Sequence, residues 1–211
     1  MDKFRRCILF SVIPAGIFYC IAILALKLAG FTTIQILRDT AQQTEVSSFL
    51  GFLSNIGVWL WVSSAAICFY SAFSSSVTLT YPRKELLLLT GTLSLILAVD
   101  DFFMIHDRYV NERICYLFYA VCGGLLLLRH YKTILEIDSI AFLLAGSLLA
   151  MSILTDLVQD HIPIMYVITQ IFEEGFKFLG VATWLYFICR ISSSQAHPAS
   201  EKVSVQNLAE E

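Results

Sequence analysis

Ionisable side chains lie inside an apolar stretch near the middle of this sequence. Asp100 and Asp101 are followed by His106 and Asp107, and the carboxylates begin before the apolar run has finished. On a continuous helix Asp100 and Asp107, seven residues apart, share one face, whereas Asp101 and His106 project to other sides. A charge in the middle of a membrane costs about 2.5 to 3.5 kcal/mol, so such residues usually face the interior of a helix bundle and serve a site. The alternative is a helix end that dips into the lipid headgroups.

A second cluster lies in the last apolar stretch of the chain. Glu173 precedes Lys177 by four residues and Glu174 precedes it by three, so both carboxylates can reach the ammonium group on a helix. An ion pair that neutralises itself during membrane insertion is the structural alternative to a functional site. Two carboxylates for one lysine leave a surplus negative charge, which invites a metal ion, a proton or a basic partner.

The two clusters together predict a metal-assisted active site. Mixed carboxylate and imidazole ligands suit zinc, manganese or iron, and the sequence does not choose among them. A bound cation would offset the negative charge, lower the pKa of its water and polarise a carbonyl or phosphoryl group. The predicted metal ligands are Asp100, His106, Asp107 and Glu173. The predicted catalytic residues are Glu173, Glu174, Lys177 and Asp100.

Other polar residues fall at a similar depth once helices are assigned. Asn55 is a second polarising group beside Lys177, and Asp156 and Asp160 share a face at four-residue spacing. His161, like His106, is a candidate metal ligand or proton relay. These residues meet only if their helices pack together. Near a helix end, Asp156 and Asp160 are equally well interpreted as solvated side chains.

Composition places these residues in a membrane protein. The chain has 211 residues, of which 57% are hydrophobic and 15% charged, and its mean hydropathy is +0.73. A span needs about 20 mostly apolar residues, and six stretches qualify, which predicts an all-α, six-span helix bundle. The predicted spans are Cys7 to Gly30, Ser48 to Ser74, Leu86 to His106, Ile114 to Leu128, Ile140 to Leu157 and Ile164 to Cys189. A net charge of −3 provides no basic surface, so we expect no nucleic-acid partner.

Charge distribution predicts the orientation of the bundle. Nine Lys and Arg residues fall in the segments assigned to the cytoplasm and four in those outside, which favours cytoplasmic N- and C-termini. We expect residues 1–191 to form a single transmembrane domain and residues 192–211 a disordered cytoplasmic tail. The chain is thus predicted as a multi-pass protein of the cell membrane, in bacteria the inner membrane. Its lipid bilayer is one partner, and its oligomeric state is open.

The two motifs carry a resemblance to known families. Asp100-Asp101 with His106-Asp107, followed by Glu-Glu-x-x-Lys in the last span, resembles an uncharacterised family of small bacterial polytopic membrane proteins, whose members have His-Glu in place of His106-Asp107. Glu173-Glu174-x-x-Lys177 alone is similar to a motif of presumed intramembrane peptidases, in which such carboxylates would activate water. This chain lacks the further motifs that those peptidases carry on later helices, and its own motif lies on the last span.

Three classes of function follow from these features. The leading hypothesis is a metal-dependent intramembrane hydrolase, with a lipid or a membrane peptide as its substrate. The first alternative is a proton- or cation-coupled transporter or channel, because intramembrane ionisable residues also mark ion pathways. Against it, the inner halves of the predicted helices are almost uncharged and no inverted repeat is visible. The second alternative is a structural or sensory subunit whose ion pairs set helix register only.

Overall fold

The computed structural model describes residues 12–37, 43–47, 49–74, 79–159 and 165–193. Over these ranges the regular secondary structure is helical throughout, with no strand. The prediction of an all-α protein is therefore confirmed. The chain divides into two compact units, Met1–Phe52 and Leu53–Glu211, and the site described below lies in the second.

The first unit contains one long apolar helix. Helix α2 (Ile13–Leu28) has Pro14 in its first turn, where the missing N–H costs no hydrogen bond, and is followed by the short helix α3 (Thr33–Leu37). Gly30 adopts φ 97°, a conformation that glycine reaches without a steric penalty, and so ends the helix. None of the residues of α2 is buried, and all but Ala22 and Ile23 are exposed.

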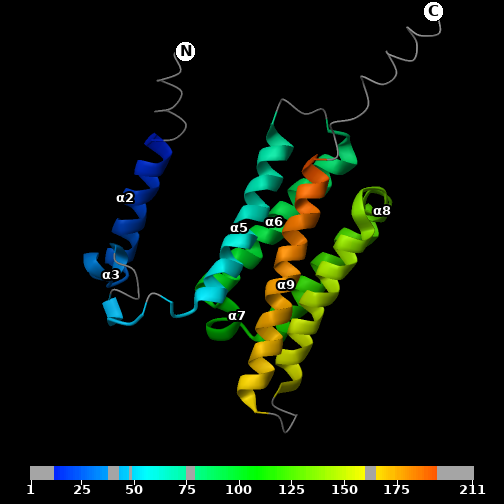
Figure 1. Cartoon of the computed structure of the whole chain (residues 1–211). Helices are drawn as coiled ribbons and strands as arrows, with labels where there is room; N and C mark the ends of the chain where they lie inside the picture. The colour runs from blue at the N-terminus through cyan, green and yellow to red at the C-terminus, as the bar shows by residue number, and fades with distance from the viewer. Residues whose placement is uncertain (1–11, 38–42, 48, 75–78, 160–164, 194–211) are drawn as a thin grey trace, which may run out of the picture. The chain divides into compact units, whose positions relative to one another are not determined.

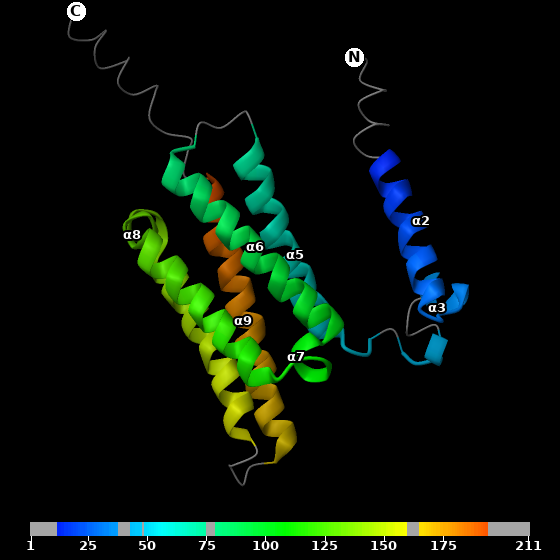
Figure 2. The same ribbon diagram turned by 180° about the vertical axis from the view of Figure 1, so that it is seen from behind.

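The second unit is a bundle in which the longest helix is folded back on itself (Figures 1 and 2). Its elements are α5 (Phe52–Phe73), α6 (Tyr81–Phe103), α7 (Ile105–Arg108), α8 (Glu112–Gln159) and α9 (Tyr166–Ser193). Helix α8 has non-helical backbone angles at His130 and Asp138, and both views show two limbs running side by side from this bend. The Asp138 carboxylate accepts a hydrogen bond from the N–H of Ala141 at 3.0 Å and so caps the second limb.

Within the described residues, three helices are long and apolar enough to cross a membrane. They are α5, α6 and α8, and they indicate a membrane protein. Helix α2, described over 16 residues, is shorter than a full span, and the predicted first span begins outside the described residues. Helix α9 combines an apolar C-terminal half with Glu173, Glu174 and Lys177. Of the predicted tail, only Ser192 and Ser193 are described, and they end α9.

The tightest packing lies at the end of the bundle where α6 begins and α9 finishes. Leu86 and Leu87 of α6 and Phe187 and Ile188 of α9 are fully buried there, beside Ile134 at the bend of α8. Figures 1 and 2 show these segments at the same end of the bundle. The opposite end of α6, which carries the ionisable residues, therefore extends from a firmly packed base.

Small residues allow two of the helices to approach closely, as in many membrane bundles. A Cβ atom added to Gly180 of α9 would lie 2.8 Å from Leu149 Cγ and 3.1 Å from the backbone nitrogen of Leu149 on α8. Gly180 is therefore a site of helix contact. Gly175, five residues earlier on α9, would meet no atom within 4 Å.

We expect Gly180→Ala to destabilise the protein by about 1 to 3 kcal/mol, because the new methyl group overlaps the Leu149 side chain and lies tightly against the Leu149 backbone nitrogen. Gly175→Ala, on the same helix but facing open space, is the matched control and should be neutral or slightly stabilising. Thermal unfolding of the purified variants, followed by size-exclusion chromatography, measures the difference. Equal unfolding temperatures for the two variants would show that α8 and α9 do not touch at Gly180.

Candidate functional site

A reversal of the chain after α6 builds the first part of the site. Helix α6 ends at Phe103, and Met104 adopts the left-handed conformation (φ 52°, ψ 47°) with its N–H bonded to the Asp100 carbonyl. A non-glycine residue in this conformation costs about 1 to 2 kcal/mol, so contacts on either side must hold it. The predicted continuous span from Leu86 to His106 is therefore wrong at its end, because α7 starts in a new direction at Ile105.

The reversal brings His106 back onto the last turn of α6. Asp100 is only 4% exposed, and its carboxylate accepts hydrogen bonds from the His106 backbone N–H at 2.9 Å and from the ring Nδ1 at 2.7 Å. The hydrogen bond to Asp100 raises the pKa of His106 above its ordinary value. The other ring nitrogen, Nε2, lies 3.3 Å from Asp107 Oδ1, and the Asp107 side chain is 59% exposed. The predicted shared face of Asp100 and Asp107 is wrong, because the helix ends between them.

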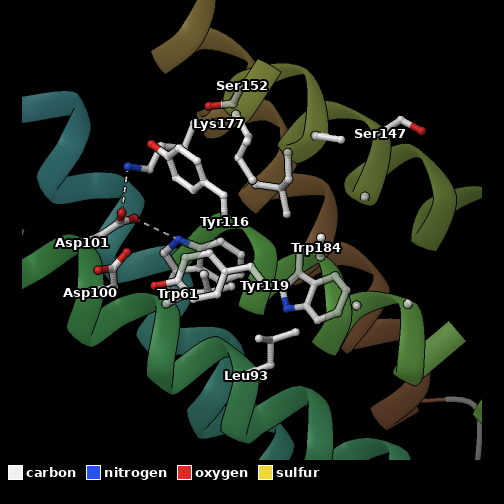
Figure 3. Close-up of a pocket in the computed structure, with 18 of the residues that line it drawn as sticks. Trp61, Leu93, Asp100, Asp101, Tyr116, Tyr119, Ser147, Ser152, Lys177 and Trp184 are labelled. Carbon is white, nitrogen blue, oxygen red and sulfur yellow. Dashed lines mark hydrogen bonds and ion pairs between the residues drawn. The ribbon is translucent and has the colours of Figure 1, made fainter. Parts of the chain in front are cut away.

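An ion pair between two helices forms the second part of the site. Lys177 Nζ of α9 lies 2.7 Å from Asp101 Oδ1 of α6, and Trp61 Nε1 of α5 donates a hydrogen bond to Asp101 Oδ2 at 3.1 Å (Figure 3). Among the described residues Lys177 thus pairs with Asp101 and not, as predicted, with Glu173 or Glu174. Three helices meet at one carboxylate, which was not among the predicted site residues.

A chain of hydrogen bonds links the two limbs of α8 to α9. The Tyr116 hydroxyl of the first limb donates to Asp156 of the second limb at 2.5 Å, and Gln159 donates to the same carboxylate at 2.7 Å. Gln170 of α9 donates to Gln159 at 3.4 Å and to Glu173 at 2.6 Å. Glu173 is therefore oriented by Gln170.

These groups line the polar end of a pocket of about 450 Å³ (Figure 3). Its polar side chains include Asp100, Asp101, His106, Tyr116, Asp156, Glu173 and Lys177. Its apolar side chains include Leu93, Leu97, Leu127, Phe142 and Trp184. Ligand pockets in proteins commonly enclose about 300 to 1,000 Å³, so the space suits a small molecule.

The structure gathers part of the predicted site and leaves other parts out. Asp100, His106, Glu173 and Lys177 all line the pocket. Glu174 and Asp107 are not among its lining residues, and Asn55 is exposed on α5 away from it. Asp156 lines the pocket, whereas Asp160 and His161 lie outside the described residues.

Three of the lining residues could share a metal ion. Asp100, Asp101 and His106 each offer a ligand atom, and these atoms all lie within 4.8 Å of one another. Within the part of the chain that the structure describes, this group contains the predicted ligands Asp100 and His106. It lacks the predicted ligands Asp107 and Glu173 and contains Asp101 instead. Two carboxylates and an imidazole form a ligand set that suits zinc, manganese or iron.

The sequence feature that could have indicated a role for Asp101 is the presence of Lys177 inside an apolar helix. A charged residue inside an apolar helix needs a partner, and Lys177 has potential partners on α6, α7 and α8 as well as on its own helix. Spacing along α9 favoured Glu173 and Glu174, but a turn of helix brings side chains near each other without aiming them into the same cavity. Tyr116 and Trp61, which hold Asp156 and Asp101, gave no signal distinct from ordinary aromatic packing.

Comparison with known families decides where the chain belongs. The model of a family described as a domain of unknown function (DUF8692) matches residues 14–191. The chain belongs to this family. The matched region contains every residue that lines the pocket, and the family fits the resemblance to an uncharacterised group of proteins. No curated protein and no solved structure matches the chain, and the similarity to intramembrane peptidases stays a prediction.

We expect Asp101→Asn and Lys177→Met each to destabilise the protein by about 3 kcal/mol, because each removes one partner of a largely buried ion pair. The double variant should recover most of this loss, since both charges are gone. Chemical unfolding in detergent of the wild type, both single variants and the double variant gives the coupling energy. Additive losses would mean that Asp101 and Lys177 do not interact.

Proposed function

We propose that this protein is a membrane-embedded, metal-dependent hydrolase that acts at the polar end of the pocket. The observation that carries the proposal is the convergence of Asp100, Asp101 and His106 at that end. Lys177, the one lysine or arginine among the lining residues, faces four carboxylates there, those of Asp100, Asp101, Asp156 and Glu173. A divalent cation would offset this surplus negative charge.

A cation bound by Asp100, Asp101 and His106 could activate water for hydrolysis. A bound divalent metal lowers the pKa of its water to about 7 and polarises a carbonyl or phosphoryl oxygen. Asp100 holds His106 Nδ1 in place and so fixes the orientation of the imidazole ring. Asp101 would exchange its ion pair with Lys177 for the metal, which frees the ammonium group to stabilise the oxyanion of the transition state.

Glu173 is the proton acceptor in this scheme. It lines the same pocket, and its carboxylate is oriented by the hydrogen bond from Gln170. The water oxygen forms a bond to the carbonyl or phosphoryl centre while Glu173 takes the water proton. The bond to the leaving group then breaks, and the same proton passes to the leaving group. Of the predicted catalytic residues, Glu174 has no part in this scheme because it does not line the pocket.

The membrane arrangement proposed here has six spans and cytoplasmic termini, in the cell membrane of a bacterium. The bend of α8 at His130 and Asp138 supports it, because each limb then covers one predicted span, Ile114 to Leu128 and Ile140 to Leu157. The excess of Lys and Arg on the predicted inner side supports the orientation. The pocket would then lie in the outer half of the bundle.

Ion or proton transport is the second candidate, and one observation favours it. The hydrogen-bonded series from Tyr116 through Asp156, Gln159 and Gln170 to Glu173 joins two carboxylates across three helical segments. Such chains of ionisable and polar groups occur in proton pathways. Beyond the pocket, however, the described residues form a packed apolar layer around Phe187 and Ile188, which counts against a continuous pathway.

Elemental mass spectrometry tests the metal. Purified wild-type protein should hold about one equivalent of a divalent metal, and Asp100→Asn, Asp101→Asn and His106→Gln should each lower retention at least about tenfold. Asp107→Asn is the matched control: it is a neighbouring carboxylate outside the three-residue group and should keep the metal. A wild-type protein without metal, or equal loss in the control, would contradict the site.

Chelation and activity test the reaction. Release of 4-nitrophenol from 4-nitrophenyl butyrate should disappear on treatment with a chelator and return with added metal. Glu173→Gln should keep the metal and lose at least about 100-fold in kcat, because the proton acceptor is gone. Hydrolysis that survives both treatments would place the chemistry elsewhere in the molecule.

Reporter fusions test the proposed topology. Alkaline phosphatase is active only outside the cytoplasm, so a fusion after Arg113 should be active and a fusion after Lys132, at the bend of α8, should be inactive. A cytoplasmic reporter such as β-galactosidase at the same two positions is the complementary control. The reverse pattern would invert the bundle and place the pocket in the inner half.

A further inference from the structure

The ionisable side chains lie toward one end of the pocket, and the rest of the lining is mostly apolar apart from Ser147. Leu97 and Leu93 continue the lining along α6, three and seven residues before Asp100, so the apolar wall begins one helical turn from the ligand group. Figure 3 shows Leu93 and Trp184 on the side away from Lys177 and Asp101. A ligand that fills this space is polar at one end and apolar along the rest.

The end of the pocket at Trp184 is apolar. Trp184 donates its indole N–H to Ser94 Oγ at 2.9 Å, so its polar atom is satisfied and its ring offers only an apolar face. The rings of Phe142 and Phe187 lie 5.8 Å and 6.0 Å from the Trp184 ring and close the space behind it. The pocket thus ends in an aromatic wall.

Three glycines give the pocket its width. Gly123 and Gly124 of the first α8 limb and Gly146 of the second limb all line it, and a Cβ atom at any of them would meet nothing within 4 Å. Glycine inside a helix costs about 1 kcal/mol relative to alanine. Here the three glycines leave open a channel along which an unbranched chain can lie.

The same glycines open the pocket sideways. Gly124 and Gly146 are exposed, and so are the neighbouring apolar residues Leu125, Leu143 and Leu144 of the two limbs. In the proposed membrane arrangement this surface faces the hydrocarbon layer. A molecule dissolved in the bilayer therefore has a lateral route into the pocket.

We infer that the substrate is a single-chain acyl amphiphile, whose aliphatic chain lies in the channel between the α8 limbs and whose acyl carbonyl lies at the ligand group. This inference rests on the proposed hydrolase function for its reaction. Because the apolar wall starts one turn from Asp100, the polar group that reaches the ligands is the one attached directly to the chain. Water adds to the carbonyl carbon, the acyl bond to the head group breaks, and the head group leaves with a proton, without redox change.

Tryptophan fluorescence gives a direct test of chain binding. The sequence has three tryptophans, of which Trp61 and Trp184 line the pocket and Trp59 is 65% exposed. A Trp59→Phe protein in lipid nanodiscs therefore reports on the pocket alone. The probe is 12-bromododecanoic acid, whose terminal bromine quenches tryptophan on contact and which cannot be hydrolysed. Quenching should saturate, and unbrominated dodecanoic acid should reverse it.

Two glycine variants decide whether the chain lies in the channel. Gly146→Leu fills the channel and should reduce the saturable quenching at least fivefold, whereas Gly57→Leu, in equally open space on α5 outside the pocket, should leave it unchanged. Size-exclusion elution identical to the parent shows that both variants fold. Equal quenching in Gly146→Leu, or none that saturates in the parent, overturns the inference.

The test separates the inference from the proposed function. If quenching fails while metal retention and hydrolysis of 4-nitrophenyl butyrate persist, the acyl amphiphile is overturned and the hydrolase stands. If quenching is saturable and lost in Gly146→Leu but the protein holds no metal, chain binding is supported and the hydrolase is overturned.

Discussion

The cost of placing charge in an apolar interior is the constraint on which this structure depends. The ammonium group of Lys177 and the carboxylate of Asp101 lie 2.7 Å apart between α9 and α6, and both side chains are mostly buried. Neither charge is tolerable there alone. Their pairing fixes the two helices against each other, and Trp61 adds α5 through the same carboxylate. One contact thus sets the positions of three helices around the pocket.

The chain reversal at Met104 completes the site by a local rather than a long-range device. A helix that continued past Phe103 would carry His106 away from Asp100, but the left-handed residue turns the backbone so that Asp100 accepts two hydrogen bonds from His106. These bonds offset the strain at Met104. The imidazole is therefore held by the last turn of α6, whose opposite end is anchored in the packed core through Leu86 and Leu87.

Hydropathy predicted the all-helical class, because a run of about 20 apolar residues has the length of a membrane-spanning helix and is too long for a strand. Of the predicted site residues, Asp100, His106, Glu173 and Lys177 line the pocket. Their pairing was predicted less well. Helical spacing identifies neighbours on the same helix, whereas Lys177 pairs with Asp101 on a different helix. The helix break at Met104 contains no glycine or proline, so the sequence carries no residue that predicts it. Long-range pairing and an unmarked break both depend on tertiary contacts that no window of sequence contains.

The two ends of the bundle differ in how their charges are balanced, and this difference favours a site over a purely structural role. At the far end, Glu85 pairs with Arg129 at 2.6 Å and Asp138 faces Arg190 at 3.7 Å, so each of these two acids has its own base. At the pocket, four carboxylates share one lysine and one histidine. Ion pairs that only set helix register need no such surplus. An excess of ligating oxygens beside an open channel is what a cation and its substrate require.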